Sequence, residues 1–180
     1  MPRVLAAVLA LCLLAPAGAR ARGPSTPEER KRAVETTRRL EKEPLARSSM
    51  EARKWLFQWI VDIPDVHVTS CSGPLDVLQQ DEDDPYAAIL YVQSVFGMAA
   101  FIVDNPKKAD DWVAVQTAGI ESVLRAYEAI RRADSEAGWK NLDRLLEARR
   151  AGKLPALVRK EMARCGTAGE DMGPAPRDAI

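Results

Sequence analysis

The sequence contains a single histidine, His67, and none of the short motifs that mark common catalytic sites. No serine lies in a G-x-S-x-G turn, no H-E-x-x-H pair occurs, and no glycine-rich phosphate loop is present. Neither Cys71 nor Cys165 has an activating base close to it in the chain. These absences argue against an enzyme, although carboxylate pairs that meet only in the folded chain leave no such trace.

An excess of charge of one sign is also missing. Lys and Arg together number 26, and Asp and Glu together number 26, so the whole chain is formally neutral. A nucleic-acid-binding protein normally shows a basic excess or a basic stripe. We therefore expect no nucleic-acid partner, and no motif indicates a cofactor, whereas a protein partner of unknown identity remains open.

The N-terminus has the three parts of a secretory signal peptide. Arg3 supplies positive charge, residues 4–14 form an uncharged apolar run, and small residues follow as far as Ala21. The apolar run is about half the ~20 residues that a membrane-spanning helix needs. Cleavage after Ala19 or after Ala21 fits equally well. We therefore expect residues 1–21 to be removed and the protein to be exported to the periplasm or the medium, without a membrane span.

Cysteine is scarce, with three residues in the chain. Cys12 lies within the signal peptide and leaves with it, so Cys71 and Cys165 remain. In an oxidising compartment an isolated pair indicates a disulfide, which for a loop of roughly 95 residues contributes about 4.7 kcal/mol in the chain-entropy model. A redox pair and a metal site are the alternatives, but the first normally has C-x-x-C spacing and the second needs more ligands than one histidine adds.

Helical periodicity runs through most of the remaining chain. Residues 26–29 (TPEE) and 48–51 (SSME) match the capping box, and residues 84–85 and 105–106 place a cap before proline. Ser135 is expected to cap a later helix. We predict an all-α domain of five or six helices, over residues 27–43, 48–61, 86–103, 106–132, 135–150 and 155–165, with a short helical turn at 75–80. Residues 66–69 alternate as an extended piece without a partner strand.

The segment 86–103 is apolar almost all round, which is typical of a buried helix. Gln93, Ser94 and the acidic flanks favour a core helix over a membrane span. Gly97 lies inside it and Gly119 lies on the apolar stripe of the following helix, so we expect a close crossing at which these two glycines face each other.

The expected organisation is a signal peptide over residues 1–21, a charged N-terminal helix or leader over 22–47, the helical domain over 48–166, and a disordered tail over 167–180. The segment 22–47 has few apolar positions, so we expect its helix to dock weakly or to remain a flexible leader. The tail is rich in Gly, Pro and charge.

Two acidic groupings are candidates for a metal. Asp62, Asp65 and His67 lie near a predicted helix end and could supply ligands to a divalent ion, although the two aspartates also flank the helix-ending Pro64 in the usual way. The run at residues 81–84 lacks the glycine and the distal glutamate of an EF-hand, and is better explained as a solvated helix-initiating loop.

Charge and aromatic residues are unevenly spread. Residues 22–54 carry 10 basic and 6 acidic side chains, residues 62–111 carry 2 and 10, and residues 112–165 carry 11 and 7. We expect these regions to complement one another within the domain, the alternative being electrostatic steering of a partner. Helical spacing places most of the large aromatics in the core: Trp55, Phe57, Trp59, Trp112 and Trp139. Trp55 and Phe57 lie off the apolar stripe of their helix, so we expect one of these two to be open to solvent.

Four runs resemble exported, uncharacterised proteins of high-GC bacteria: residues 51–60 (EARKWLFQWI), 66–71 (VHVTSC), 97–106 (GMAAFIVDNP) and 119–130 (GIESVLRAYEAI). The resemblance covers Ser48 to Cys165 and implies no activity. In architecture alone the chain is similar to the HdeA-type periplasmic acid-stress chaperones, which are exported, all-helical and held by one disulfide. Its cysteines lie much farther apart, and no site residue carries over.

These features favour a non-enzymatic exported protein that binds a partner or acts in stress. The alternative is a metal- or carboxylate-dependent hydrolase with its site near Asp62, Asp65 and His67. A pocket that converges on these three residues would favour the enzyme, and an exposed aromatic patch would favour the binding protein.

Overall fold

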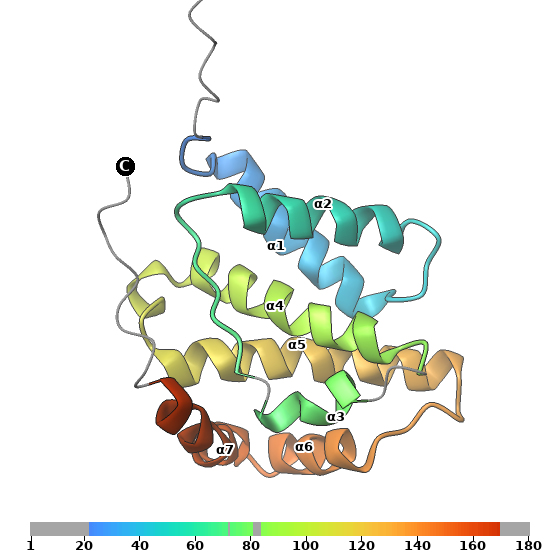
Figure 1. Cartoon of the computed structure of the whole chain (residues 1–180). Coiled ribbons are helices and arrows are strands. Elements are labelled where there is room, and N and C mark those ends of the chain that lie inside the picture. Colours follow the sequence, from blue (N-terminus) through green and yellow to red (C-terminus); the bar gives the residue numbers. More distant parts are fainter. Residues whose placement is uncertain (1–21, 72, 81–83, 170–180) are drawn as a thin grey trace, which may run out of the picture.

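The computed structural model describes residues 22–71, 73–80 and 84–169, with side chains as far as residue 163, and this part of the chain is all-helical. It contains seven α-helices, two short 3-10 helices and no strand (Figure 1). The elements are α1 (Pro27–Lys42), α2 (Ser49–Asp62), η1 (Gly73–Leu75), α3 (Asp76–Gln80), α4 (Ala87–Asp104), η2 (Pro106–Lys108), α5 (Trp112–Ala133), α6 (Lys140–Arg150) and α7 (Leu154–Gly169).

The all-α prediction is confirmed, and the predicted number of five or six helices is wrong. The additional helix is α3, which is too short for its sequence to show a helical period. Leu75 and Leu78 bury their side chains in the core, and this packing holds the turn in helical form. The predicted signal peptide, residues 81–83 of the acidic run and residues 170–180 of the predicted tail lie outside the described residues.

The helices form three layers, with α4 and α5 in the middle (Figure 1). Helices α1 and α2 cover one side of this pair, while α3, α6 and α7 cover the other. Helix α4 is the one described helix long and apolar enough to span a membrane, and more than half of it is buried between its neighbours. The expected central helix is thus confirmed, one residue later than predicted at each end.

Helices α4 and α5 cross in close contact. A Cβ atom at Gly97 would lie 2.3 Å from Cβ of Ser122 and 3.0 Å from the carbonyl oxygen of Ala118. A Cβ atom at Gly119 would lie 2.9 Å from the carbonyl oxygen of Ser94. Both glycines therefore line the interface as expected, but they do not face each other: Gly97 faces Ala118 and Ser122, and Gly119 faces Ser94 and the Met98 side chain.

The expectation that residues 22–47 dock weakly is wrong, because α1 packs against α2, α4 and α5. Ala33, Thr37, Leu40 and Glu41 are buried along one face of α1. Two of these four residues are polar, so the face does not show as an apolar stripe in the sequence. Their burial is tolerated because both side chains have hydrogen-bond partners inside the fold.

Of the predicted starts of α1, α2, α5 and α6, one agrees with the structure and three differ from it. The capping box at Thr26 is confirmed, whereas Ser48 makes no side-chain cap and Ser49 donates instead to the carbonyl of Glu43 at 2.7 Å. Helix α5 begins at residue 112 rather than 106, with Asp111 as its cap, because the turn after residue 105 is 3-10. Helix α6 begins at residue 140 rather than 135, since residues 135–136 form a turn and residues 137–139 are irregular.

Ion pairs join the basic N-terminal region to the acidic middle region, as expected from the charge distribution. Arg30 binds Asp65 at 2.5 Å, and Arg38 lies 3.9 Å from Asp104. The extended segment after α2, which carries Asp65, passes across α4 and α5 toward α3 (Figure 1). The charge pattern therefore reflects packing within one fold.

Substitution of Gly97 by alanine tests the helix crossing. The new methyl group cannot fit without moving α4 away from α5, so we expect a loss of about 1–3 kcal/mol in the free energy of unfolding, even though alanine has a better helix propensity. Urea unfolding monitored by circular dichroism measures this. Gly23→Ala, which meets no atom within 4 Å, is the matched control and should leave stability unchanged.

Candidate functional site

The residues predicted as metal ligands are not brought together. Asp62 is exposed at the end of α2 and accepts a hydrogen bond from Gln58 at 2.7 Å. His67 is exposed on the extended segment, while Asp65 is turned toward the N-terminal residues. Among the described residues no three His, Cys, Asp or Glu side chains are grouped to hold a metal ion.

Asp65 has a different role, because it anchors the start of α1. Its carboxylate accepts hydrogen bonds from the backbone N–H of Ser25 at 2.8 Å and from the Ser25 hydroxyl at 2.7 Å, and it pairs with Arg30. Desolvation works to raise the pKa of Asp65, but these hydrogen bonds and the Arg30 charge outweigh it and hold the pKa at about 2. We call this set of three residues the Asp65 clamp.

Cys71 is buried at the end of the extended segment, in the core cluster that also contains Leu154, Val158 and Met162 of α7. Cys165 belongs to α7, three residues after Met162, and its side chain lies outside the described residues. The fold therefore brings the segment with Cys71 against the helix with Cys165.

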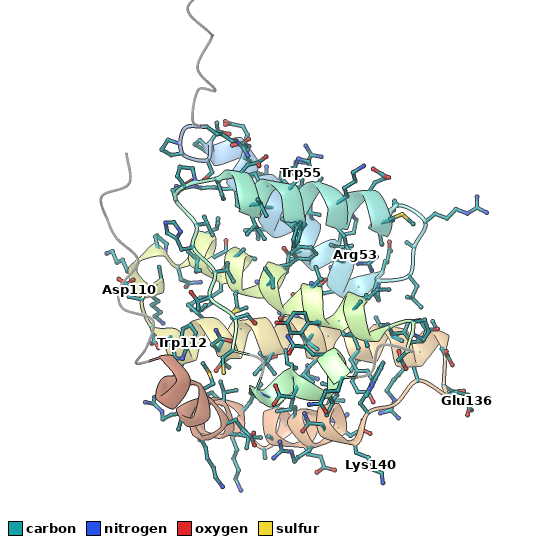
Figure 2. The ribbon with its side chains drawn as sticks, viewed as in Figure 1. Arg53, Trp55, Asp110, Trp112, Glu136 and Lys140 are labelled. Carbon is teal, nitrogen blue, oxygen red and sulfur yellow. The ribbon has the colours of Figure 1, made fainter. Side chains whose placement is uncertain are left out.

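The large aromatics divide between core and surface. Trp59 and Trp139 are buried, and Trp55 stacks on Trp59 with ring centroids 6.2 Å apart. Phe57 is 52% exposed and is thus the off-stripe aromatic that is open to solvent, whereas Trp112 is 39% exposed and its expected place in the core is wrong. Trp112 is exposed because it is the first residue of α5, at the edge of the molecule (Figure 2).

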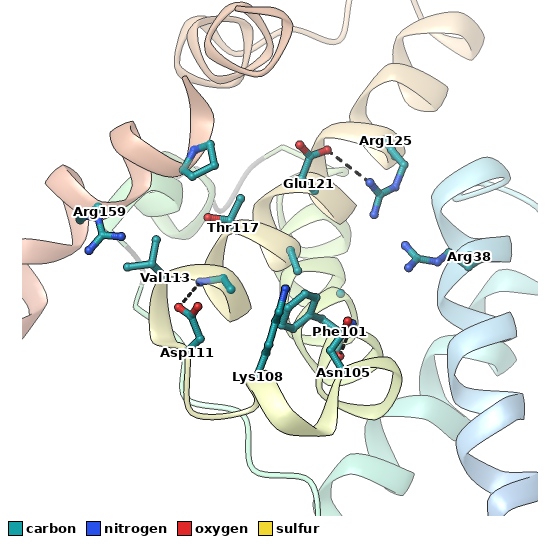
Figure 3. Close-up of a pocket in the computed structure, with 14 residues that line it drawn as sticks. Arg38, Phe101, Asn105, Lys108, Asp111, Val113, Thr117, Glu121, Arg125 and Arg159 are labelled. Carbon is teal, nitrogen blue, oxygen red and sulfur yellow. Dashed lines mark hydrogen bonds and ion pairs between the residues drawn. The ribbon is translucent and has the colours of Figure 1, made fainter. Parts of the chain in front are cut away.

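A cleft of about 520 Å³ opens between α1, α4, α5 and the start of α7 (Figure 3). This volume lies within the ~300–1,000 Å³ range of small-molecule sites. Part of its wall is apolar or backbone, from Gly97, Phe101, Val113, Ala114, Ala118 and Pro155. The rest is polar or charged, from Arg38, Asn105, Lys108, Asp111, Thr117, Glu121, Arg125 and Arg159.

Both carboxylates at the cleft are already engaged. Asp111 caps α5 by accepting a hydrogen bond from the N–H of Ala114 at 3.1 Å. Glu121 lies 3.4 Å from Arg125 and 3.9 Å from Arg149. The hydroxyl oxygen of Thr117 is buried at the wall and has no hydrogen-bond partner in the described part of the chain.

A buried polar network stands behind the cleft where α1 meets α4 and α5. The Glu41 side chain is 4% exposed and receives two hydrogen bonds from Arg125, at 2.7 and 2.8 Å. Ser122 donates to Glu41 at 2.7 Å and accepts from Gln93 at 2.9 Å. Burial works to lower the pKa of Arg125, but the hydrogen bonds and charge of Glu41 dominate, and its pKa is raised.

The sequence does not mark the charged residues that line the cleft. A local signal exists only for the network behind it, because Glu41 occupies a position of the buried α1 face, four residues after Thr37 and eight after Ala33. A charge at such a position means either that this face of the helix is not buried or that the charge has a partner inside the fold, and the sequence does not distinguish the two. Arg38, Arg125 and Arg159 come from three helices that meet only in the folded chain.

Replacing Asp65 by asparagine tests the clamp. At pH 7 we expect a loss of about 1–2 kcal/mol, because charge-assisted hydrogen bonds are weakened. The folded-state pKa lies below the ordinary value of 3.8, so the stabilisation is complete above about pH 4 and is lost as the pH falls toward 2.

Urea unfolding of the wild type and of Asp65→Asn at pH 7, 4 and 2.5 measures this difference, which should shrink toward zero at the lowest pH. Asp62→Asn is the control, because Asp62 is exposed and should give the same small change at each pH. A difference that stayed constant with pH would show that the carboxylate charge is not what stabilises the clamp.

Replacing Arg125 by alanine tests the polar network. This change leaves the Glu41 carboxylate buried without its two main donors, and breaking such a pair typically costs several kcal/mol. We expect a loss of about 3 kcal/mol by thermal or urea unfolding. The control is Lys31→Ala, which removes an exposed pair with Glu35 at 3.9 Å and should cost less than about 0.5 kcal/mol. Equal losses in both variants would contradict a buried network.

Comparisons with protein-family models, with curated proteins and with solved structures find no match for this chain. The resemblance drawn from the sequence therefore stays a prediction, and the function has to be argued from the geometry of the chain itself.

Proposed function

We propose that this chain is an exported, non-enzymatic binding protein whose ligand site is the cleft between α1, α4, α5 and α7. The observation that carries the proposal is the cleft itself, which combines an apolar wall with charged side chains and has the volume of a small-molecule site. Its two carboxylates are held by a helix end and by arginines, which suits them to structure rather than to acid–base chemistry.

Export rests on the signal peptide predicted for residues 1–21, which gives a periplasmic or secreted protein. In that compartment we propose a disulfide between Cys71 and Cys165. The packing of η1 against α7 supports it, because the two chain segments that carry the cysteines lie against each other. The bond would tie the extended segment to the last helix.

A neutral fluorescent probe, N-phenyl-1-naphthylamine, tests whether the cleft binds ligands. We expect a saturable rise in fluorescence with the folded mature protein. Ala114→Trp should weaken binding by at least about fivefold, because the indole fills part of the cleft. Ala88→Trp, at an exposed position of α4 outside the cleft, is the matched control and should bind as the wild type does.

Circular dichroism and the Tm of each variant show whether it is folded. If the probe does not saturate, or if both tryptophan variants bind equally, the cleft is not the binding site and the proposed function fails.

Thiol titration tests the disulfide. Unfolded, unreduced mature protein should show no free thiol, and reduction should release two. Replacing both cysteines by alanine should lower the free energy of unfolding by about 2–4 kcal/mol. Two free thiols before reduction would contradict the bond, with the redox or metal alternatives then favoured.

A further inference from the structure

The four cations at the cleft are not equivalent. Arg125 is neutralised by Glu41 and Glu121, and Arg38 shares Glu41 at 3.1 Å. Both arginines are therefore engaged by carboxylates, and the pair between Arg125 and Glu41 joins α5 to α1. Such paired groups have little attraction left for a ligand.

Lys108 and Arg159 are different. Both side chains are exposed, and neither makes an ion pair within the described residues. Lys108 comes from η2 and extends toward the middle of the lining residues, while Arg159 comes from α7 on the other side of Val113 (Figure 3). Two cations from separate elements thus line one cleft, and neither has an ion-pair partner in the part of the chain that the structure describes.

Two carboxylates line the cleft, and Glu121 is paired with Arg125 and Arg149, so Asp111 is the lining carboxylate left to weigh against these two cations. The N-terminus of α5 partly compensates the negative charge of Asp111, whose carboxylate accepts a hydrogen bond from the N–H of Ala114. Counting Lys108, Arg159 and Asp111 together leaves one positive charge at this end of the cleft. The apolar part of the wall, from Phe101, Val113 and Pro155, lies beside it.

We propose that the cleft binds a small amphipathic monoanion, in which a carboxylate, phosphate or sulfonate head is joined to a short apolar body. The head pairs with Lys108 and Arg159, and the body lies against Phe101, Val113 and Pro155. This inference rests on the proposed function and adds the chemical class of its ligand. Arg159 suits an oxyanion head because a guanidinium can bind two of its oxygens at once.

Two probes of similar shape separate the inference from the proposed function. 1-Anilinonaphthalene-8-sulfonate carries an anionic sulfonate, and N-phenyl-1-naphthylamine is the same framework without it. We expect the sulfonate to bind the wild type more tightly. Lys108→Ala and Arg159→Ala should each weaken sulfonate binding by about 3–10-fold and leave the neutral probe within about twofold.

Arg132→Ala provides the matched control, because Arg132 is an exposed cation at the far end of α5 from Lys108. It should bind both probes as the wild type does. Raising the salt concentration should weaken the sulfonate alone, since exposed charges are screened. Near-UV circular dichroism of each protein shows that the probes report a folded state.

The anion can be a free amphiphile or the headgroup of a lipid, and competition distinguishes them. Sodium decanoate below its aggregation concentration should displace the sulfonate probe from the wild type. Phosphatidylglycerol vesicles at the same anion concentration should displace it less, because the cleft accepts a short apolar body. Displacement by the vesicles at least as strong as by decanoate would overturn the small-ligand inference.

The two proposals fail in different ways. If the neutral probe binds and the sulfonate gains nothing, or if Lys108→Ala and Arg159→Ala weaken both probes equally, the anion inference is overturned while the binding cleft stands. If neither probe saturates, the cleft itself is refuted. Tighter sulfonate binding that depends on both cations and is blocked by Ala114→Trp supports the inference.

Discussion

The close approach of α4 and α5 is the contact on which the other helices depend. Gly97 and Gly119 lack the side chains that would hold the two backbones apart. Ala118 and Ser122 lie opposite Gly97, and Ser94 and Met98 lie opposite Gly119. Every other α-helix in the described chain packs on this pair or on a neighbour that does. Helix α5 contacts both α1 and α7, so the pair holds the walls of the cleft in place.

The buried polar network fixes how α1 sits on that pair. Glu41 brings a charge into the junction, where Arg125, Ser122 and Gln93 satisfy its oxygens directly or through each other. A shift of α1 along α5 would take Glu41 away from Arg125 and Ser122 and leave it with Arg38 of its own helix. Breaking a buried ion pair costs more than the pair contributes in net stability. The network thus works mainly as a determinant of register, and the Asp65 clamp fastens the same helix at its other end.

The α4–α5 crossing and the Glu41 network hold the helices around the cleft, and the charged residues that line it come from distant parts of the sequence. The arginines that hold α1 in place are neutralised by their glutamates, so the cations that remain for a ligand are Lys108 and Arg159. Each of them alone is an ordinary surface charge. Their common exposure to one partly apolar cleft is what gives the binding proposal its chemical direction.

The sequence alone determined the features that depend on short-range patterns: the all-α class, the buried central helix, the close glycine crossing and the cap at Thr26. Periodicity and capping are local, so they show in a single chain. The tertiary structure decided the burial of α1, the later starts of α5 and α6, the exposure of Phe57 and Trp112, and the cleft. These features depend on which surfaces and charges meet across long separations, and a polar residue such as Glu41 becomes a buried one only when Arg125 arrives from another helix.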